Sequence, residues 1–146
     1  MKRKIKHKGK TLSHETEIKV RFSEVDSMAI TWHGSYVKFL EDARESFGEK
    51  YNLGYLDVYE KGFVIPLVNI NIDYKKPLIY GDKAIVKITF VDNDAAKLYF
   101  EYEIRNKANN ELVATAETTQ IFMNTDKELV FYSPDFFIEW KEQYLI

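Results

Sequence analysis

Five stretches of the chain alternate apolar and polar side chains, and this pattern limits the possible folds more than any other feature of the sequence. Successive side chains of a strand point to opposite faces, so each stretch predicts a strand with one buried side and one solvent-facing side. The last stretch is partly apolar on both faces, which predicts a strand in the middle of the sheet or at a subunit interface. The five stretches are residues 17–22, 68–74, 83–90, 97–105 and 111–124.

Between the first two stretches, the apolar spacing changes to that of an amphipathic helix. Ser35 is the predicted N-cap, and either Gly48 or the segment 52–54 is expected to end the helix. Short helices are also predicted at residues 56–61 and in the segment after Pro134. The apolar stripe of the main helix consists of Tyr36, Phe39, Leu40, Ala43 and Phe47.

The last three strands are expected to form a meander, because residues 92–94 and 108–110 are short links rich in Asn and Asp. A helix with one apolar stripe must be covered, and an antiparallel sheet with one apolar face is its natural cover. The sequence therefore predicts an α+β fold in which a five-stranded antiparallel sheet wraps around one long central helix.

A length of 146 residues fits one compact domain. Apolar residues make up 45% of the sequence, which excludes the composition of a disordered chain. The formal net charge is −2, and six cations lie among the first ten residues, so the rest of the chain carries about −8 by subtraction. We expect a basic N-terminal tail at residues 1–14 and a single domain at residues 15–146.

The basic tail has two interpretations. Clustered cations can bind nucleic acid or anionic lipid, whereas the alternative is a frayed, solvated terminus. We favour the second and expect no nucleic-acid partner. No apolar h-region follows the basic residues, and no apolar run approaches the roughly 18–20 residues that span a bilayer. The sequence therefore predicts a cytoplasmic protein without a membrane span.

The chain has no cysteine, which excludes a disulfide, a thiol nucleophile and a thiolate metal site. It also has no Gly-rich phosphate-binding loop and no His-x-x-x-His pair, so we expect neither a metal nor a cofactor. Imidazole chemistry is limited to His7, His14 and His33.

Residues 21–44 read RFSEVDSMAITWHGSYVKFLEDAR and join the first predicted strand to the main helix. This segment resembles the signature of the 4-hydroxybenzoyl-CoA thioesterase-like acyl-CoA thioesterases, which have the hotdog fold. The signature combines an acidic loop ending in Asp, an aromatic-His pair, a helical Tyr and Glu-x-Ala-Arg. Its counterparts here are Phe22, Glu24, Asp26, Ala29, Trp32, His33, Tyr36, Glu41, Ala43 and Arg44.

A second block, NINIDYKKPLIYGDKAIV at residues 69–86, is similar to the family's Asp-Tyr-x-x-Pro-x-x-x-Gly-Asp segment. The likeness covers residues 16–125 and departs at Ala29, where the family usually has Gly. The resemblance implies a hydrolase that cleaves an acyl-CoA thioester to the free acid and CoA.

The resemblance implies that Asp26 supplies the attack, either as a nucleophile or as a general base that orients water. The first N–H groups of a helix lack intrahelical partners and favour negative charge. We hypothesise that N–H groups near His33 and Gly34 form the oxyanion hole, and that Gly34 lets the substrate approach closely. A turn role for Asp26 and a purely structural role for His33 remain open as alternatives.

Trp32 and Tyr36 are candidates for the acyl pocket, although core packing would place them in the same way. Glu41 is a candidate for substrate binding or for an ion pair or hydrogen bond that supports the loop, with Arg44 as the partner of an acid. Lys75 and Lys76 either hold the phosphates of CoA or belong to the solvated surface.

The main alternative to an enzyme is a non-catalytic module that binds an acyl or CoA ligand in the same groove. Carrier-protein thioesters are alternative substrates. Hydration of an enoyl thioester is a further hotdog reaction, but the position of the carboxylate on the loop disfavours it. Hotdog dimers typically pair their sheets edge to edge, so the resemblance implies a homodimer or homotetramer with a shared site.

Overall fold

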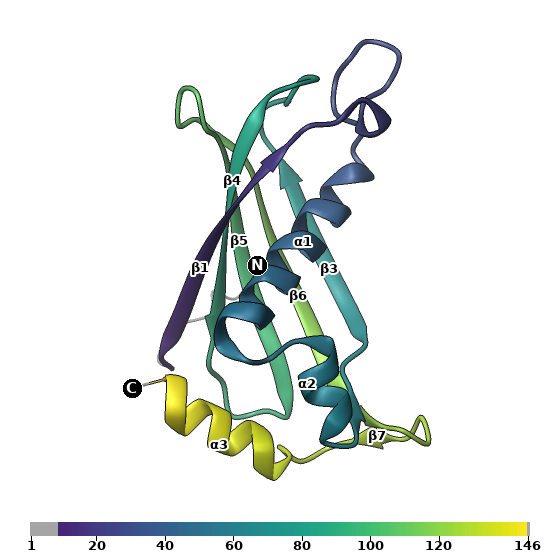
Figure 1. Ribbon diagram of the computed structural model, residues 1–146, viewed down its shortest axis with the longest axis vertical. Coiled ribbons are helices and arrows are strands. Elements are labelled where there is room, and N and C mark those ends of the chain that lie inside the picture. Colours follow the sequence, from purple (N-terminus) through teal and green to yellow (C-terminus); the bar gives the residue numbers. More distant parts are fainter. Residues whose placement is uncertain (1–8, 146) are drawn as a thin grey trace, which may run out of the picture.

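The computed structural model describes residues 9–145, and most of the predicted basic tail lies outside this range. No helix within the range is long and apolar enough to cross a membrane. Figure 1 shows the arrangement of the helices and strands. In chain order they are β1 (Thr11–Lys19), η1 (Phe22–Glu24), α1 (Ser35–Tyr51), α2 (Tyr55–Glu60), β2 (Phe63–Val64), β3 (Leu67–Tyr74), β4 (Lys83–Val91), β5 (Lys97–Asn106), β6 (Leu112–Asn124), β7 (Leu129–Val130) and α3 (Asp135–Tyr144).

The strands pair antiparallel, in the order β1-β4-β5-β6, and β3, β2 and β7 each pair with β6. The prediction of an α+β fold with an antiparallel sheet is confirmed. The predicted count of five strands is wrong, because the described sheet has seven. The strands β2 and β7 contain two residues each, which is too short for an alternating pattern to be recognised in the sequence.

The first strand differs from its prediction at both ends. Residues 11–14, which the sequence analysis assigned to the tail, pair with β4 as the start of β1. At the other end β1 stops at Lys19, and Phe22 begins the short helix η1 with an exposed ring. The carboxylate of Glu24 accounts for this break, because it accepts a hydrogen bond from the Arg21 N–H at 2.8 Å and holds the chain in a turn.

The helix α1 crosses one face of the sheet and contacts β1 and β4 (Figure 1). It buries every residue of the predicted apolar stripe. The helix ends at the predicted segment 52–54 and not at Gly48. Asn52 has a left-handed backbone with φ 58°, and its N–H donates to the Gly48 carbonyl. Gly48 lets the chain turn back closely, because a Cβ there would lie 2.8 Å from Cα of Gly54.

Aromatic rings fill the core between α1, the sheet and α3. The ring centroids of Phe47 and Phe100 lie 5.2 Å apart, as do those of Phe90 and Trp140. Trp140 also donates from Nε1 to the carbonyl of Tyr51 at 2.7 Å, which attaches α3 to the end of α1. The predicted C-terminal helix is confirmed as part of this core.

The two predicted links close tight hairpins. The side-chain oxygen of Asn93 accepts the N–H of Ala95 at 2.8 Å, and that of Asn109 accepts the N–H of Glu111 at 2.9 Å. The strands β4, β5 and β6 are therefore consecutive neighbours. Because β6 also pairs with β3 on its other side, its predicted place inside the sheet is confirmed.

Replacing Phe47 by Ala should lower the free energy of unfolding by about 3–5 kcal/mol, because the ring is fully buried and its loss leaves a cavity. Urea denaturation followed by circular dichroism measures the change. Phe131→Ala is the matched control, since that ring is 85% exposed, and its effect should stay within about 0.5 kcal/mol. Equal losses in the two variants would contradict this description of the core.

Candidate functional site

The loop between β1 and α1 lies at the upper end of the molecule in Figure 1 and folds back on itself. Val25 forms a β-bridge with Thr31, and the N–H of Trp32 donates to the Glu24 carbonyl at 2.9 Å. The hydroxyl of Ser35 donates to the same carbonyl at 3.1 Å. These bonds hold the acidic segment of the loop against the first turn of α1.

The loop depends on the buried carboxylate of Glu24, of which 3% is exposed. Arg21 binds it through the backbone N–H and the guanidinium, and Lys38 of α1 lies 3.3 Å from it. Burial is the largest single influence and opposes ionisation, but the hydrogen bonds from Arg21 and Lys38 outweigh it and hold the pKa of Glu24 below its usual value. Glu24 is therefore ionised, and its contact with Lys38 connects the end of η1 to α1.

Asp26 is exposed, and its carboxylate helps to shape the loop. Oδ1 accepts the N–H of Met28 at 2.8 Å and that of Ile30 at 3.2 Å, so the turn role considered for this residue is present. In the same turn Ala29 has φ 61°, a conformation that Gly adopts more readily. Oδ2 has no partner among the described residues and remains accessible for chemistry.

The start of α1 leaves backbone donors free. Ser35 is the predicted N-cap, but Gly34 holds that position. The hydroxyl of Ser35 donates to the Glu24 carbonyl instead. Within residues 9–145, the N–H groups of His33 and Gly34 have no hydrogen-bond acceptor, and the first turn contains no acid. The positive end of the helix dipole thus presents two free donors, which suits a developing negative charge.

The surroundings of these donors are partly closed. The indole of Trp32, itself 54% exposed, lies over Gly34, and a Cβ at Gly34 would come within 2.2 Å of it. The space that the sequence analysis expected Gly34 to leave for substrate is therefore occupied by the Trp32 ring. His33 is exposed, and its carbonyl accepts the hydroxyl of Tyr74 at 2.9 Å, which connects the start of α1 to the end of β3.

Tyr36 belongs to the core. Its side chain is 3% exposed and packs against Tyr74 and Phe39, with ring centroids 5.0 and 5.5 Å apart. Burial raises the pKa of the Tyr36 hydroxyl, against the opposing effect of a hydrogen bond to the backbone of Leu78. Of the two interpretations considered for this residue, core packing describes its position.

Lys75 and Lys76 follow β3 directly, beside Tyr74. Their N–H groups donate to one carbonyl of β6 at 2.8 and 3.0 Å, while both side chains are exposed. Lys76 forms a long ion pair, 3.9 Å, with Glu111. Because Tyr74 bonds to His33, the two lysines lie on the segment that adjoins the start of α1.

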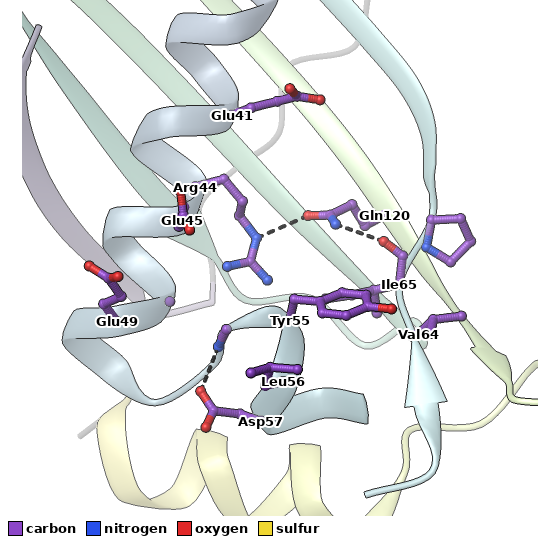
Figure 2. Close-up of a pocket in the computed structure, with 13 residues that line it drawn as sticks. Glu41, Arg44, Glu45, Glu49, Tyr55, Leu56, Asp57, Val64, Ile65 and Gln120 are labelled. Carbon is purple, nitrogen blue, oxygen red and sulfur yellow. Dashed lines mark hydrogen bonds between the residues drawn. The ribbon is translucent and has the colours of Figure 1, made fainter. Parts of the chain in front are cut away.

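A cavity of about 700 Å³ opens near the other end of α1, between α1, α2 and the segment from β2 to β3 (Figure 2). A smaller cavity of about 80 Å³ continues it along α1 as far as Val37. Glu41, Arg44 and Gln120 line both cavities, which we together call the α1–β3 groove. Of the predicted substrate-binding residues, Glu41 alone lines it in the described part of the chain.

Arg44 lies at the junction of the two cavities. The predicted partner of Arg44 is an acid, but within the described range its Nε donates to the Gln120 side chain at 3.1 Å. Its guanidinium lies 5.0 Å from the Phe100 ring centroid. Gln120 is fixed in turn by donating to the Ile65 carbonyl at 2.8 Å (Figure 2). Burial lowers the pKa of Arg44 to about 10. Gln120 was not anticipated, because it is distant in sequence and no local pattern marks it.

Comparison with known proteins places the chain in a family. Residues 20–140 match the profile of the thioesterase-like superfamily. The chain belongs to this superfamily. The resemblance that the two sequence blocks predicted is therefore confirmed.

Individual members of the thioesterase-like superfamily resemble the chain over most of its length. It is 34% identical to the Bacillus subtilis protein named "Putative acyl-CoA thioesterase YneP", over 88% of this chain and 92% of the relative. It is 26% identical to the acyl-acyl carrier protein thioesterase ATL3 of Arabidopsis thaliana, over 80% of this chain and 62% of that protein. The structure of a DHNA-CoA thioesterase from Staphylococcus aureus, 30% identical, matches with a TM-score of 0.80 over 90% of this chain and 88% of the other. The α+β fold is thus that of the hotdog thioesterases.

Replacing Glu24 by Gln should lower the free energy of unfolding by about 2 kcal/mol at pH 7, because charge-assisted hydrogen bonds are lost. The folded-state pKa of Glu24 is depressed, so its contribution is complete above the unfolded value of about 4.3 and disappears as the pH falls through the folded value. Urea denaturation at pH 7 and at pH 3 should therefore show a smaller difference between wild type and variant in acid.

The control for this comparison is Glu17→Gln, which removes an exposed ion pair with Lys107. Its effect should be much smaller than that of Glu24→Gln at pH 7, since exposed pairs are screened by solvent. A loss for Glu24→Gln that does not shrink in acid would contradict the ionised anchor.

Proposed function

We propose that the protein hydrolyses acyl-CoA thioesters at the start of α1, and that Asp26, His33 and Gly34 carry the chemistry. The observation behind the proposal is that one loop combines a free carboxylate oxygen of Asp26 with the free N–H groups of His33 and Gly34. Membership of the thioesterase-like superfamily supports the reaction class.

In this mechanism the thioester carbonyl oxygen accepts hydrogen bonds from the N–H groups of His33 and Gly34. Negative charge grows on that oxygen as the tetrahedral intermediate forms, and each donor contributes on the order of 3 kcal/mol to its stabilisation. Tyr74 is a positioning residue, because its hydroxyl donates to the His33 carbonyl at 2.9 Å. This bond orients the peptide unit that also carries the Gly34 N–H.

The free Oδ2 of Asp26 suits two routes. In one, it attacks the carbonyl carbon, the C–S bond breaks, and the resulting mixed anhydride is hydrolysed by water. In the other, it accepts a proton from a water molecule whose oxygen attacks the same carbon. In both routes CoA leaves as a thiolate, and a thiol with a pKa of about 8.5 needs no strong general acid.

The carrier of the acyl group is proposed to be CoA, with Lys75 and Lys76 near its phosphates. Both side chains are exposed cations on the segment that adjoins the start of α1. A thioester of an acyl carrier protein is the second candidate, favoured by the likeness to a relative with that name. Release of free acid from matched acyl-CoA and acyl-carrier-protein substrates distinguishes the two carriers.

Replacing Asp26 by Asn should lower kcat/KM for acyl-CoA hydrolysis by about 10²–10⁴-fold, because the attacking or proton-accepting oxygen is lost. The amide oxygen of Asn can still accept the N–H groups of Met28 and Ile30, so the loop should persist. Release of free thiol from acyl-CoAs with short, long and aromatic acyl groups measures the activity.

Asp94→Asn, in the exposed β4–β5 turn, is the control and should retain full turnover. Wild-type turnover by Asp26→Asn would remove Asp26 from the mechanism. Tight binding of a nonhydrolysable acyl-CoA without any turnover by the wild-type protein would instead identify a non-catalytic binding module.

We propose that two copies pair through β3, so that each completes the other's site. The edge strand β3 exposes apolar side chains, which a second sheet edge would cover. It also carries Tyr74, which connects to His33, and it borders the α1–β3 groove. The exposed apolar residues of β3 are Leu67, Val68, Ile70 and Tyr74.

Replacing Val68 by Lys should convert the dimer to a monomer and lower turnover, because the side chain is 53% exposed on the proposed interface and lines neither cavity of the groove. Sedimentation velocity measures the assembly. Leu129→Lys on β7, where the side chain is 46% exposed, is the matched control and should leave the dimer intact. A dimer that survives Val68→Lys and dissociates in the control would place the interface elsewhere.

A further inference from the structure

We propose that the α1–β3 groove holds the acyl chain of the substrate, and that Arg44 binds an uncharged oxygen, a hydroxyl or a carbonyl, at the far end of that chain. The inference rests on the proposed thioesterase function and adds a substrate class to it. That class is acyl thioesters whose chain ends in a neutral polar group.

Arg44 has donors that the protein does not use. Its Nε is held by Gln120, whereas within the described range its terminal nitrogens have no hydrogen-bond acceptor and no carboxylate partner. Figure 2 shows the guanidinium directed into the cavity, above Tyr55 and Leu56. Arg44 is half-buried, so its unused donors are open to the cavity, and an oxygen that enters it gains charge-assisted hydrogen bonds.

The rest of the groove is suited to a hydrocarbon chain. Its walls are mainly apolar, and the hydroxyls of Tyr102 and Thr118, which line the smaller cavity, are satisfied by each other at 2.9 Å. Few convergent polar groups in an apolar groove are typical of a ligand site with a fixed orientation. The apolar lining residues are Val37, Leu40, Leu56, Val64, Ile65, Pro66, Leu67 and Ile70.

The position of Arg44 along α1 sets the length of the acyl group. A helix rises about 1.5 Å per residue, so Arg44 lies about 15 Å along the axis from the free N–H of Gly34. A single aromatic ring or a short acyl group attached to a thioester at Gly34 does not cover this distance. An extended acyl chain of medium length spans this distance and places its end at the guanidinium of Arg44.

The charges around the cavity favour an uncharged end group. Glu41, Glu45 and Glu49 of α1 and Asp57 of α2 line it with exposed side chains, and Arg44 is the one cation among the described lining residues. A carboxylate at the end of the acyl chain would meet like charges at the opening of the cavity. A hydroxyl or carbonyl oxygen uses the donors of Arg44 without that repulsion.

The test compares kcat/KM for ω-hydroxydodecanoyl-CoA, dodecanoyl-CoA and dodecanedioyl-CoA. The wild-type protein should prefer the hydroxylated chain to the plain chain by about tenfold or more, and to the dicarboxylic one, because a site built to bind an oxygen rejects a ligand that lacks it. Arg44→Met should reduce the hydroxyl preference to near unity, and Arg44→Lys, which keeps the charge but loses the planar fork, should reduce it in part. Lys50→Met, on an exposed part of the same helix, is the matched control and should retain the preference.

A preference of undiminished wild-type size in folded Arg44→Met or folded Arg44→Lys overturns the assignment. Hydrolysis without any preference by the wild-type protein overturns it as well. In both cases the thioesterase function would stand. A preference for the dicarboxylic chain overturns the uncharged class. If no acyl-CoA is hydrolysed, the proposed function fails. Calorimetry with the corresponding nonhydrolysable thioethers then decides the Arg44 proposal separately. It compares the affinities for the hydroxylated and the plain chain in the wild-type protein and in the same Arg44 and Lys50 variants.

Discussion

The buried Glu24 determines the architecture of the candidate site. Its side-chain carboxylate and its backbone carbonyl together bind the chain before η1, the loop and the helix α1. Its carboxylate is bound by Arg21 before η1 and by Lys38 on α1, and its carbonyl accepts Trp32 and the hydroxyl of Ser35. A carboxylate is buried at little cost only when such partners are present. With this anchor in place, the loop has a fixed exit into α1, and Asp26 and the free donors at His33 and Gly34 are kept at the same end of the molecule.

The helix α1 runs from this loop, at its first turn, to the α1–β3 groove along its later turns. Its first turn has free N–H groups and no acid, whereas its later turns direct Arg44 towards Gln120 on β6. The edge strand β3 runs beside the same helix and is bound to its start through Tyr74. One helix thus carries free backbone donors at its beginning, among the described residues, and further on it borders the groove that holds Arg44. Both features suit the proposed hydrolysis of a long acyl thioester.

Much of the fold was predictable from local patterns, because alternation and helical spacing report burial directly. The strands β3 to β6, the stripe of α1 and the Asn-rich links follow from them. The early end of β1 and the exposure of Phe22 were not predictable, since they depend on a buried ion pair that the alternation does not show. In the site, Asp26 and His33 came from the family-like blocks. The covering of Gly34 by Trp32 and the role of Gln120 depend on side-chain packing between segments distant in the sequence.

The most direct measurement of the central claim is a crystal structure with a nonhydrolysable acyl-CoA analogue. The account predicts that the oxygen standing for the thioester carbonyl lies about 2.7–3.1 Å from the N–H groups of His33 and Gly34. It also predicts that the adjoining carbon faces Oδ2 of Asp26, directly or through one water molecule. An analogue whose carbonyl lies away from the start of α1, with the Asp26 carboxylate directed to solvent, would contradict the account.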